Sequence, residues 1–361
     1  MGAHHRTRAS FTLTLALALL LDFSLSACSR TDDELPRREL VLYSSVDDEL
    51  LREVIRIYEA ESGVSVLVVG DTEATKTTGL VMRLIAEKGA PRADVWWSSE
   101  AFGTIRLAQD GVLERYTSTT GEAEFVGEWP PRLRGANGAW YGFAQRARVI
   151  AYSPSRVGES DIPRTLADLT GRRWKGRVGM ARPAFGTTRG QMGALMHQWG
   201  RTAFGRWASA MRENDLRLYD GNASVVRAIA QGEIDAGITD TDDVWSAERN
   251  DWDIKLVYES ADPHAGDGLW PSNGPMVIPN TAGIVHGAPH PSQARAFMDF
   301  LVSARCENLI ASSASRNVPV IPVAKELHPE LVIPGAWLPD LKEAADAIPE
   351  ALRIWDEAFG P

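Results

Sequence analysis

Three aspartates stand close together in one short segment of the chain. Asp240, Asp242 and Asp243 follow a β-rich run at 236–238. Clustered carboxylates oppose one another's ionisation unless a cation shares the site. Their oxygen atoms suit hard cations such as Ca²⁺, Mg²⁺, Mn²⁺ or Fe³⁺, although the spacing is not that of an EF-hand. The segment is therefore a candidate ligand-binding loop. Its alternative role is the N-cap of a helix that starts near Asp243, with the other carboxylates solvated.

Two further segments suggest the binding of an anion. The Gly-Thr-Thr sequence at 186–188 precedes a predicted helix at 191–199, and N–H groups at a helix start can hold a negative charge. The alternative is an ordinary threonine N-cap. Arg146 and Arg148 lie in a β-rich segment, and a guanidinium can pair bidentately with a carboxylate or a phosphate. The alternative for the arginines is a structural salt bridge.

The sequence offers little for an enzyme. It contains no Gly-x-Ser-x-Gly elbow, P-loop, dinucleotide fingerprint or zinc-protease helix motif. Asp47, Glu100 and Asp242 could supply a hydrolytic pair of carboxylates, but the sequence does not give their separation. The only cysteines are Cys28 and Cys306, which excludes a disulfide framework and a cysteine-based zinc site. We therefore predict a protein that is not an enzyme, with a secreted carboxylate-dependent hydrolase as an alternative.

The first half of the chain alternates between strand and helix patterns. The runs 40–43, 64–69 and 93–97 are β-rich, and the segments 47–59 and 78–87 between them have helical spacing of apolar residues. This order predicts an α/β fold with a parallel sheet and crossover helices.

The middle of the chain repeats this pattern. The runs 140–152, 174–180 and 236–238 have the composition of strands, and 191–199 and 225–230 have that of helices. Two α/β halves joined by extended crossover segments fit this layout.

The loops at the ends of these strands are the places to expect a ligand, because ligands of such sheets lie beyond the carboxyl ends of the strands. The loops are 44–47, 98–100, 185–188 and 239–243. The first two contribute Ser45, Asp47, Ser99 and Glu100.

The composition is that of a globular protein with room for two domains. The chain has 361 residues, of which 44% are hydrophobic and 24% charged. Its formal net charge of -10 disfavours nucleic acid as a partner, because an acidic surface repels phosphate backbones.

The first residues have the pattern of an export signal. Arg6 and Arg8 precede an apolar run at 11–21 that is too short to span a bilayer. The sequence Leu25-Ser26-Ala27-Cys28 then resembles the lipobox of bacterial lipoproteins, in which the cysteine is acylated. We predict a signal peptide over 1–27, lipidation of Cys28 and a tether over 28–38. The protein would then be lipid-anchored at the periplasmic face or cell envelope. The alternative is an ordinary secretory signal.

Four segments in order carry a family resemblance. They are Val41-Leu42-Tyr43-Ser44-Ser45-Val46-Asp47, Ala93–Ser98, Asn222–Gly237 and Ile278–Pro291 with the helix at 292–303. Together they resemble bacterial extracellular solute-binding proteins of the ferric-ion-binding group, over essentially the whole chain after the signal.

The resemblance implies a two-lobe type-II periplasmic binding protein fold, in which each lobe is a mixed sheet flanked by helices. Crossover strands join the lobes, and hinge motion closes them over the ligand. The expected boundaries are 39–144 for the first part of lobe 1, 145–270 for lobe 2 and 271–361 for a return to lobe 1 with C-terminal helices. The expected partners are an ABC transporter permease and a small solute, and the expected state is a monomer.

The resemblance also suggests a ligand. No resident cofactor is required, and a metal ion such as ferric iron, bound with a synergistic anion, is the first expectation. Asn222 matches a family position near the anion, while Glu100 and Asp47 match positions in the first lobe. Ferric-binding relatives place two adjacent tyrosines in the loop that corresponds to 239–245, where this chain has none. A phosphonate, a polyamine or a sugar is the alternative ligand.

We therefore expect carboxylates of both lobes to face one cationic centre, with Asp47 or Glu100 on the side of lobe 1. The counter-charge could be a metal ion, an ammonium ligand, or Arg146 or Arg148. The predicted metal ligands are Asp47, Glu100, Asp240 and Asp242. The predicted ligand-binding residues are Ser45, Asp47, Ser99, Glu100, Arg146, Gly186, Thr187, Thr188, Asn222, Asp240, Asp242 and Asp243.

Overall fold

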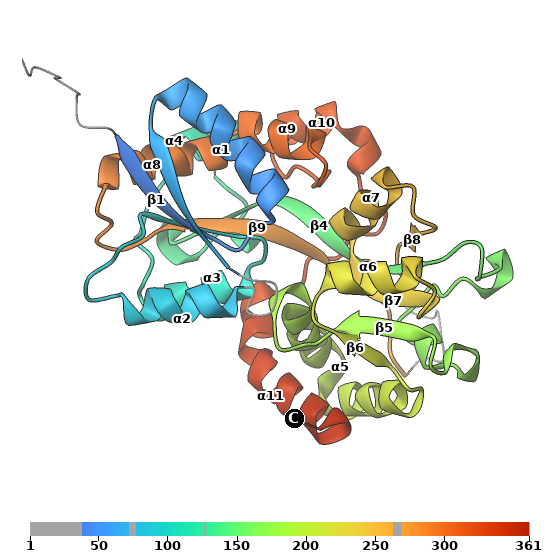
Figure 1. The fold of residues 1–361 in the computed structure, drawn as a ribbon. Helices are drawn as coiled ribbons and strands as arrows, with labels where there is room; N and C mark the ends of the chain where they lie inside the picture. The colour runs from blue at the N-terminus through green and yellow to red at the C-terminus, as the bar shows by residue number, and fades with distance from the viewer. Residues whose placement is uncertain (1–37, 72–76, 126–127, 263–268, 361) are drawn as a thin grey trace, which may run out of the picture. The chain divides into compact units, whose positions relative to one another are not determined.

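The computed structural model describes residues 38–71, 77–125, 128–262 and 269–360, and these contain a nine-stranded sheet (Figure 1). The strand order is β2-β1-β3-β9-β4-β7-β5-β6, and β8 pairs with β4 outside this path. The predicted signal peptide, Cys28 and most of the tether lie outside the described residues. Within the described ranges, none of the helices is both long and apolar enough to cross a membrane.

The first half of the sheet is built as the alternation predicts. Strands β1 (Glu39–Ser44), β2 (Ser65–Gly70) and β3 (Val95–Ser98) are parallel. Helix α1 (Asp48–Ser62) connects β1 to β2, and α2 (Thr78–Ala86) precedes β3. The apolar residues of α1 that share one face are all buried, which explains why this segment is helical.

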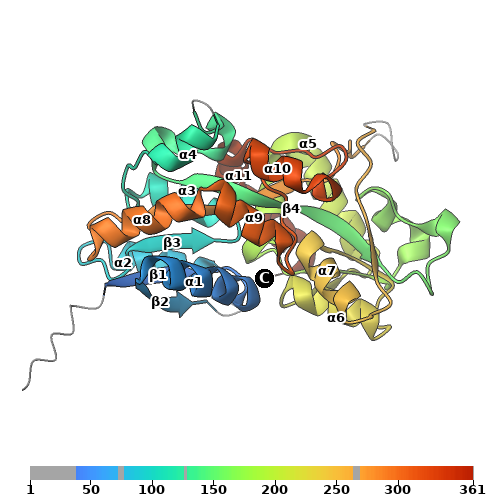
Figure 2. The ribbon, with the colours of Figure 1, turned by 90° about the horizontal axis from the view of Figure 1, so that it is seen from above.

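Two long strands join the halves of the sheet. Strands β4 (Tyr141–Tyr152) and β9 (Val277–Ile284) are antiparallel to each other. The second part of β4 leaves β9 and pairs with β7 (Ala236–Asp240) and β8 (Lys255–Val257). Figure 2 shows β4 passing from one half to the other.

The second half repeats the α/β arrangement. Parallel strands β5 (Val178–Ala181), β6 (Arg217–Tyr219) and β7 are followed by α5 (Gly186–Glu213), α6 (Asn222–Ala230) and α7 (Thr241–Arg249).

Two predicted boundaries in this half are wrong. The strand expected from 174 begins at Val178, because residues 172–174 form a 3₁₀ turn. The helix expected at 191–199 begins five residues earlier and continues past Gly200, whose φ of 74° and ψ of 165° break it into two helical pieces.

The remaining helices cover the sheet. They are α3 (Phe102–Gln109), α4 (Thr119–Glu124), α8 (Pro291–Leu301), α9 (Ala304–Ser312), α10 (Pro322–Leu327) and α11 (Leu341–Phe359). Helix α11 packs along α5 and also contacts α3. Its first part shares an apolar cluster with α3 of the first half, and its second part shares one with α5 of the second half. The last helix therefore packs against helices from both halves of the sheet.

Candidate functional site

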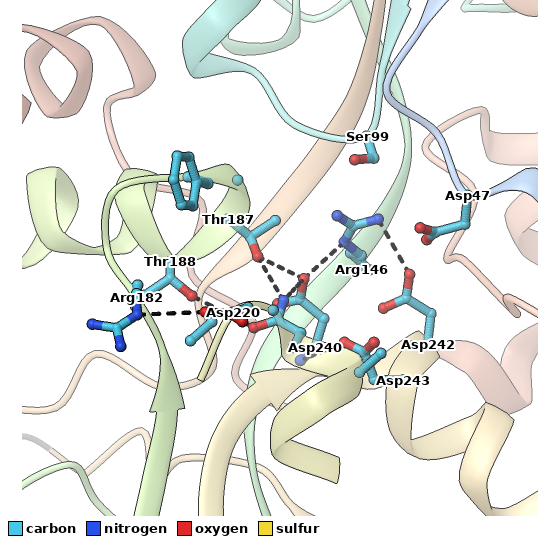
Figure 3. A pocket seen from close by; sticks show the side chains of 16 residues that line it. Asp47, Ser99, Arg146, Arg182, Thr187, Thr188, Asp220, Asp240, Asp242 and Asp243 are labelled. Carbon is cyan, nitrogen blue, oxygen red and sulfur yellow. Dashed lines mark hydrogen bonds and ion pairs between the residues drawn. The ribbon is translucent and has the colours of Figure 1, made fainter. Parts of the chain in front are cut away.

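A cavity lies where the carboxyl ends of five strands meet (Figure 3). Loops after β1, β3, β5 and β6 line it, together with the end of β7 and the start of α7. This is the position that the α/β topology favours for a ligand. The lining residues are Asp47, Ser99, Arg146, Ala181, Arg182, Phe185, Gly186, Thr187, Thr188, Asp220, Gly221, Asn222, Ala223, Asp240, Asp242 and Asp243.

Arg146 is the central cation of this cavity. Its side chain is 6% exposed; Nε lies 3.2 Å from Asp240 Oδ2, and Nη1 lies 3.2 Å from Asp242 Oδ2. Burial acts to lower the pKa of Arg146, but the charges of Asp242, Asp240 and Asp47 outweigh it and raise the pKa. The guanidinium is therefore permanently charged and holds two of the aspartates together.

Arg148 supports the floor of the site. It lies directly opposite Asp240 in the pairing of β4 with β7, and its Nη1 is 2.7 Å from Asp240 Oδ1. Its other N–H groups donate to Gln191, Thr187 and Thr188 at 3.0–3.3 Å. Such a buried ion pair needs good hydrogen bonding to be stable, and both partners have it here.

Asp240 accepts hydrogen bonds from two elements besides β4. Thr187 Oγ1 donates to its Oδ2 at 2.7 Å, and Asn222 Nδ2 donates to the same oxygen at 2.9 Å. Burial acts to raise the pKa of Asp240, but Arg148 and Arg146 outweigh it and hold the pKa below its usual range. The starts of α5 and α6 are thus tied to the end of β7 through one carboxylate.

Carboxylate oxygens of Asp240, Asp242 and Asp243 lie within 4.8 Å of one another, close enough to share a metal ion. Asp243 also accepts from the Asp240 N–H at 3.3 Å and from Thr239 Oγ1 at 3.0 Å, so it helps to cap α7. The two roles considered for this loop, ligand group and helix cap, are therefore both compatible with its geometry. In this structure the arginines supply counter-charge to Asp240 and Asp242.

A family model described as bacterial extracellular solute-binding protein matches residues 104–336. The chain belongs to this family. It is a solute-binding protein, as predicted, and its family is one of binding rather than of catalysis. A curated relative, the Fe(3+)-binding periplasmic protein of Serratia marcescens, is 24% identical over 326 residues, which cover 88% of this chain and 87% of the relative.

Solved structures confirm the predicted two-lobe type-II fold of this solute-binding protein. Iron-bound HitA from Pseudomonas aeruginosa matches with a TM-score of 0.72 and 24% identity, over 89% of this chain and 99% of that one. AfuA from Actinobacillus pleuropneumoniae, solved with fructose-6-phosphate bound, matches with a TM-score of 0.70 and 17% identity, over 89% and 98% of the two chains. The two halves of the sheet with their helices are the two lobes: lobe 1 contains β1, β2 and β3, and lobe 2 contains β5, β6 and β7.

The structure brings most of the predicted site residues of the solute-binding protein together. Among the predicted residues, ten line the cavity: Asp47, Ser99, Arg146, Gly186, Thr187, Thr188, Asn222, Asp240, Asp242 and Asp243. Asp47 and Ser99 come from lobe 1 and face the lobe 2 residues across the cavity (Figure 3).

Glu100 and Ser45 do not line this cavity. Glu100 accepts from the N–H groups of Phe102 at 2.5 Å and Gly103 at 2.9 Å, so it caps the start of α3 and lines a neighbouring cavity instead. Burial raises its pKa. Ser45 Oγ is 3.0 Å from Ser98 Oγ and accepts from Thr77 Oγ1 at 3.1 Å. The structure therefore does not place Glu100 with the aspartates that we expected to share a metal with it.

Sequence reasoning missed two charged residues of the cavity rim. Arg182 follows β5 and Asp220 follows β6; Nε of the arginine lies 3.5 Å from Oδ1 of the aspartate. The rule that ligands lie beyond strand ends applies to both positions. The sequence does not point to Asp220, because the three-residue strand β6 that precedes it has no clear pattern.

Proposed function

We propose that this solute-binding protein is the receptor of an ABC importer and that ferric iron is its cargo. The observation that carries the proposal is the group of carboxylates from Asp240, Asp242 and Asp243, whose oxygens lie within 4.8 Å of one another in the interlobe cavity. Carboxylates are suitable ligands for Fe³⁺ as a hard cation. The names of relatives support this choice: Fe(3+)-binding periplasmic protein, and iron uptake protein A1 from Synechocystis.

The proposed iron site differs from a cluster of carboxylates alone, because it also contains an arginine. Arg146 already contacts Asp240 and Asp242, so a ferric ion competes with the guanidinium for the same oxygens. An anion that arrives with the metal removes this conflict, because Arg146 can pair with the anion. The starts of α5 and α6 on the same wall, with Thr187 and Asn222, suit the same anion. We therefore propose that iron binds together with an anion.

The double substitution Asp242→Asn and Asp243→Asn is expected to weaken binding of ferric citrate by more than tenfold, because it removes two anionic ligands and leaves the buried Arg148–Asp240 pair intact. Titration calorimetry and elemental analysis of protein purified without chelators measure this. Asp161→Asn, with a side chain that is 56% exposed and outside the cavity, is the matched control and is expected to bind nearly as wild type does. Wild-type affinity in the double variant would exclude these aspartates as iron ligands.

A phosphorylated organic solute is the second candidate. Arg146 and the starts of helices α5 and α6 line one side of the cavity, and a guanidinium beside helix N-termini suits a phosphate group. The likeness to AfuA with bound fructose-6-phosphate supports the same class. For this candidate, binding of fructose 6-phosphate persists in excess chelator, and Arg146→Gln weakens it more than the double aspartate variant does. The paired arginines weigh against a polyamine, and the position of Glu100 weighs against a hydrolytic pair that includes it.

We also propose that Cys28 carries the lipid and that the protein works as an envelope-anchored monomer. The sequence Leu25–Cys28 is the support, and it lies outside the described residues. Cys28→Ser is expected to move the folded protein from the membrane fraction to the soluble fraction after cell lysis, with unchanged melting temperature. Fractionation with immunoblotting measures this, and continued membrane retention of a processed variant would contradict it.

A further inference from the structure

Strand β4 contains a bulge just before the arginines of the site. Phe143 lies opposite Asn280 of β9, whereas Gln145 lies opposite Pro279, so Ala144 is one extra residue in β4. The backbone of Ala144 has a φ of 42°, in the left-handed region that is unfavourable for residues other than glycine. A non-glycine residue keeps this conformation only where its surroundings hold it.

The bulge lies two residues before Arg146, where β4 passes from one half of the sheet to the other. Phe143, before the bulge, packs in the apolar cluster with α1 and α8, whereas Ile278, opposite Arg146, packs in the cluster with α3 and α11. A bulge bends its strand and increases the local twist, and so redirects the side chains that follow it. The direction in which Arg146 and Arg148 leave β4, and with it their ion pairs with Asp240 and Asp242, therefore depends on the bulge.

Glu307 of α9 holds this bulge. Its Oε1 accepts from the Ala144 N–H at 2.7 Å, and its Oε2 accepts from the N–H groups of Val320 at 2.9 Å and Ile321 at 2.7 Å. The Ala144 carbonyl accepts from Asn280 Nδ2 at 2.6 Å, so both backbone groups that the bulge removes from the ladder have partners.

A carboxylate in this position is costly to bury. Glu307 is completely buried, and burial raises its pKa to about 7, against the opposing effect of the backbone N–H groups that it accepts from. The arrangement makes three charge-assisted hydrogen bonds to two segments that are far apart in the sequence.

We propose that Glu307 is a positioning residue for solute binding: it holds the bulge at Ala144 and thereby places Arg146 and Arg148 in the interlobe cavity. Glutamine at 307 has one acceptor oxygen and turns its NH₂ group toward a backbone donor, so the bulge loses part of its support. Glycine at 144 adopts a positive φ without steric cost and needs less support. The two substitutions together give a direct test.

The experiment is hydrogen exchange with mass spectrometry on the ligand-free protein. Glu307→Gln is expected to speed exchange in residues 145–152 by on the order of tenfold or more, as loss of hydrogen bonds to a charged group predicts. Ala144→Gly in the same background is expected to restore slow exchange in 145–152 but not at Val320 and Ile321, whose N–H groups donate to Glu307. If Glu307 has a purely structural role, Ala144→Gly changes the exchange rates of both segments in the same way. If Ala144→Gly does not restore slow exchange in residues 145–152, the proposal is overturned.

Binding adds a second readout, which rests on the proposed function. Glu307→Gln is expected to weaken binding of ferric citrate by about tenfold at a temperature where the variant is folded, and Ala144→Gly to restore it. Glu259→Gln is the matched control, since burial raises the pKa of Glu259 to about 7 as well, but its contacts lie near residues 166 and 272. Equal loss in the control would contradict the proposal. If the wild type fails to bind ferric citrate, the proposed function fails, while the exchange experiment still tests Glu307.

Discussion

Asp240→Ala is expected to lower the free energy of unfolding by about 3–5 kcal/mol, the usual cost of removing one partner of a buried ion pair. Asp240 is 1% exposed and accepts from Arg148, Thr187 and Asn222, and it also pairs with Arg146. Its loss leaves two buried guanidinium groups without their shared carboxylate. Urea unfolding measures the change, and binding of ferric citrate is expected to be lost with it.

The pH dependence of the free energy of unfolding shows whether the ion pairs of Asp240 cause the loss of stability in the variant. The pKa of Asp240 is lower in the folded protein than in the unfolded chain, where it is about 3.9. Its contribution to stability is therefore complete above that value and declines as the pH falls through the folded-state pKa. The difference between wild type and variant is expected to narrow in this acidic window. Asp220→Ala, with a side chain that is 83% exposed, is the control and is expected to change stability by less than about 1 kcal/mol. A difference that stays constant in acid would argue against the ion pairs.

Gly193→Ala is expected to destabilise the protein by about 2–3 kcal/mol through overpacking. A Cβ atom on Gly193 would lie 2.3 Å from the Ala344 carbonyl oxygen and 2.6 Å from Ile348 Cγ1, so helices α5 and α11 must move apart. The first of these contacts is with a backbone carbonyl, which cannot relieve the overlap by changing rotamer as a side chain can. Thermal and urea unfolding measure the effect.

Gly205→Ala, in the second helical piece of α5, is the matched control. Its Cβ would meet Ile354 Cγ2 at 3.4 Å, an ordinary contact, and alanine is the better helix former. This variant is expected to be more stable than wild type by about 0.5–1 kcal/mol. If both alanines destabilise equally, the close approach of α5 and α11 at Gly193 is not the reason.

Most of the fold could be predicted from the periodicity of apolar residues in the sequence. Helix α1 and strand β1 lie within a few residues of their predicted positions, because their buried faces are continuous in the sequence. The short strand β6 could not be predicted, because three residues are too few to show a period of apolar side chains. The break at Gly200 could not be predicted either, because a glycine inside a helical pattern is compatible with a continuous helix as well as with a break.

For the candidate site, the predicted topology identified the loops but not the individual side chains that line the cavity. Strand ends located the loops, but which side chain of a loop turns inward depends on tertiary contacts. In the loop after β3, Ser99 lines the cavity, whereas Glu100 turns to the start of α3. The direction of the Arg146 side chain depends on a bulge, and the extra residue of a bulge cannot be recognised in the sequence of the strand. Partners such as Glu307, 163 residues from Ala144, become visible only in the folded chain.

Helix α11 completes two apolar clusters that are built by different parts of the chain. Leu341, Ala344 and Ile348 pack with α3 residues, and Ile354 and Trp355 pack with α5 residues. This helix follows every other described element in the sequence. During synthesis from the N-terminus, neither cluster can close until these last residues have been made. A nascent chain that lacks them leaves apolar surface of both lobes uncovered, and so stays available to chaperones that keep proteins unfolded. The same contact that ties the lobes together thus delays the closing of both clusters until α11 has been synthesised.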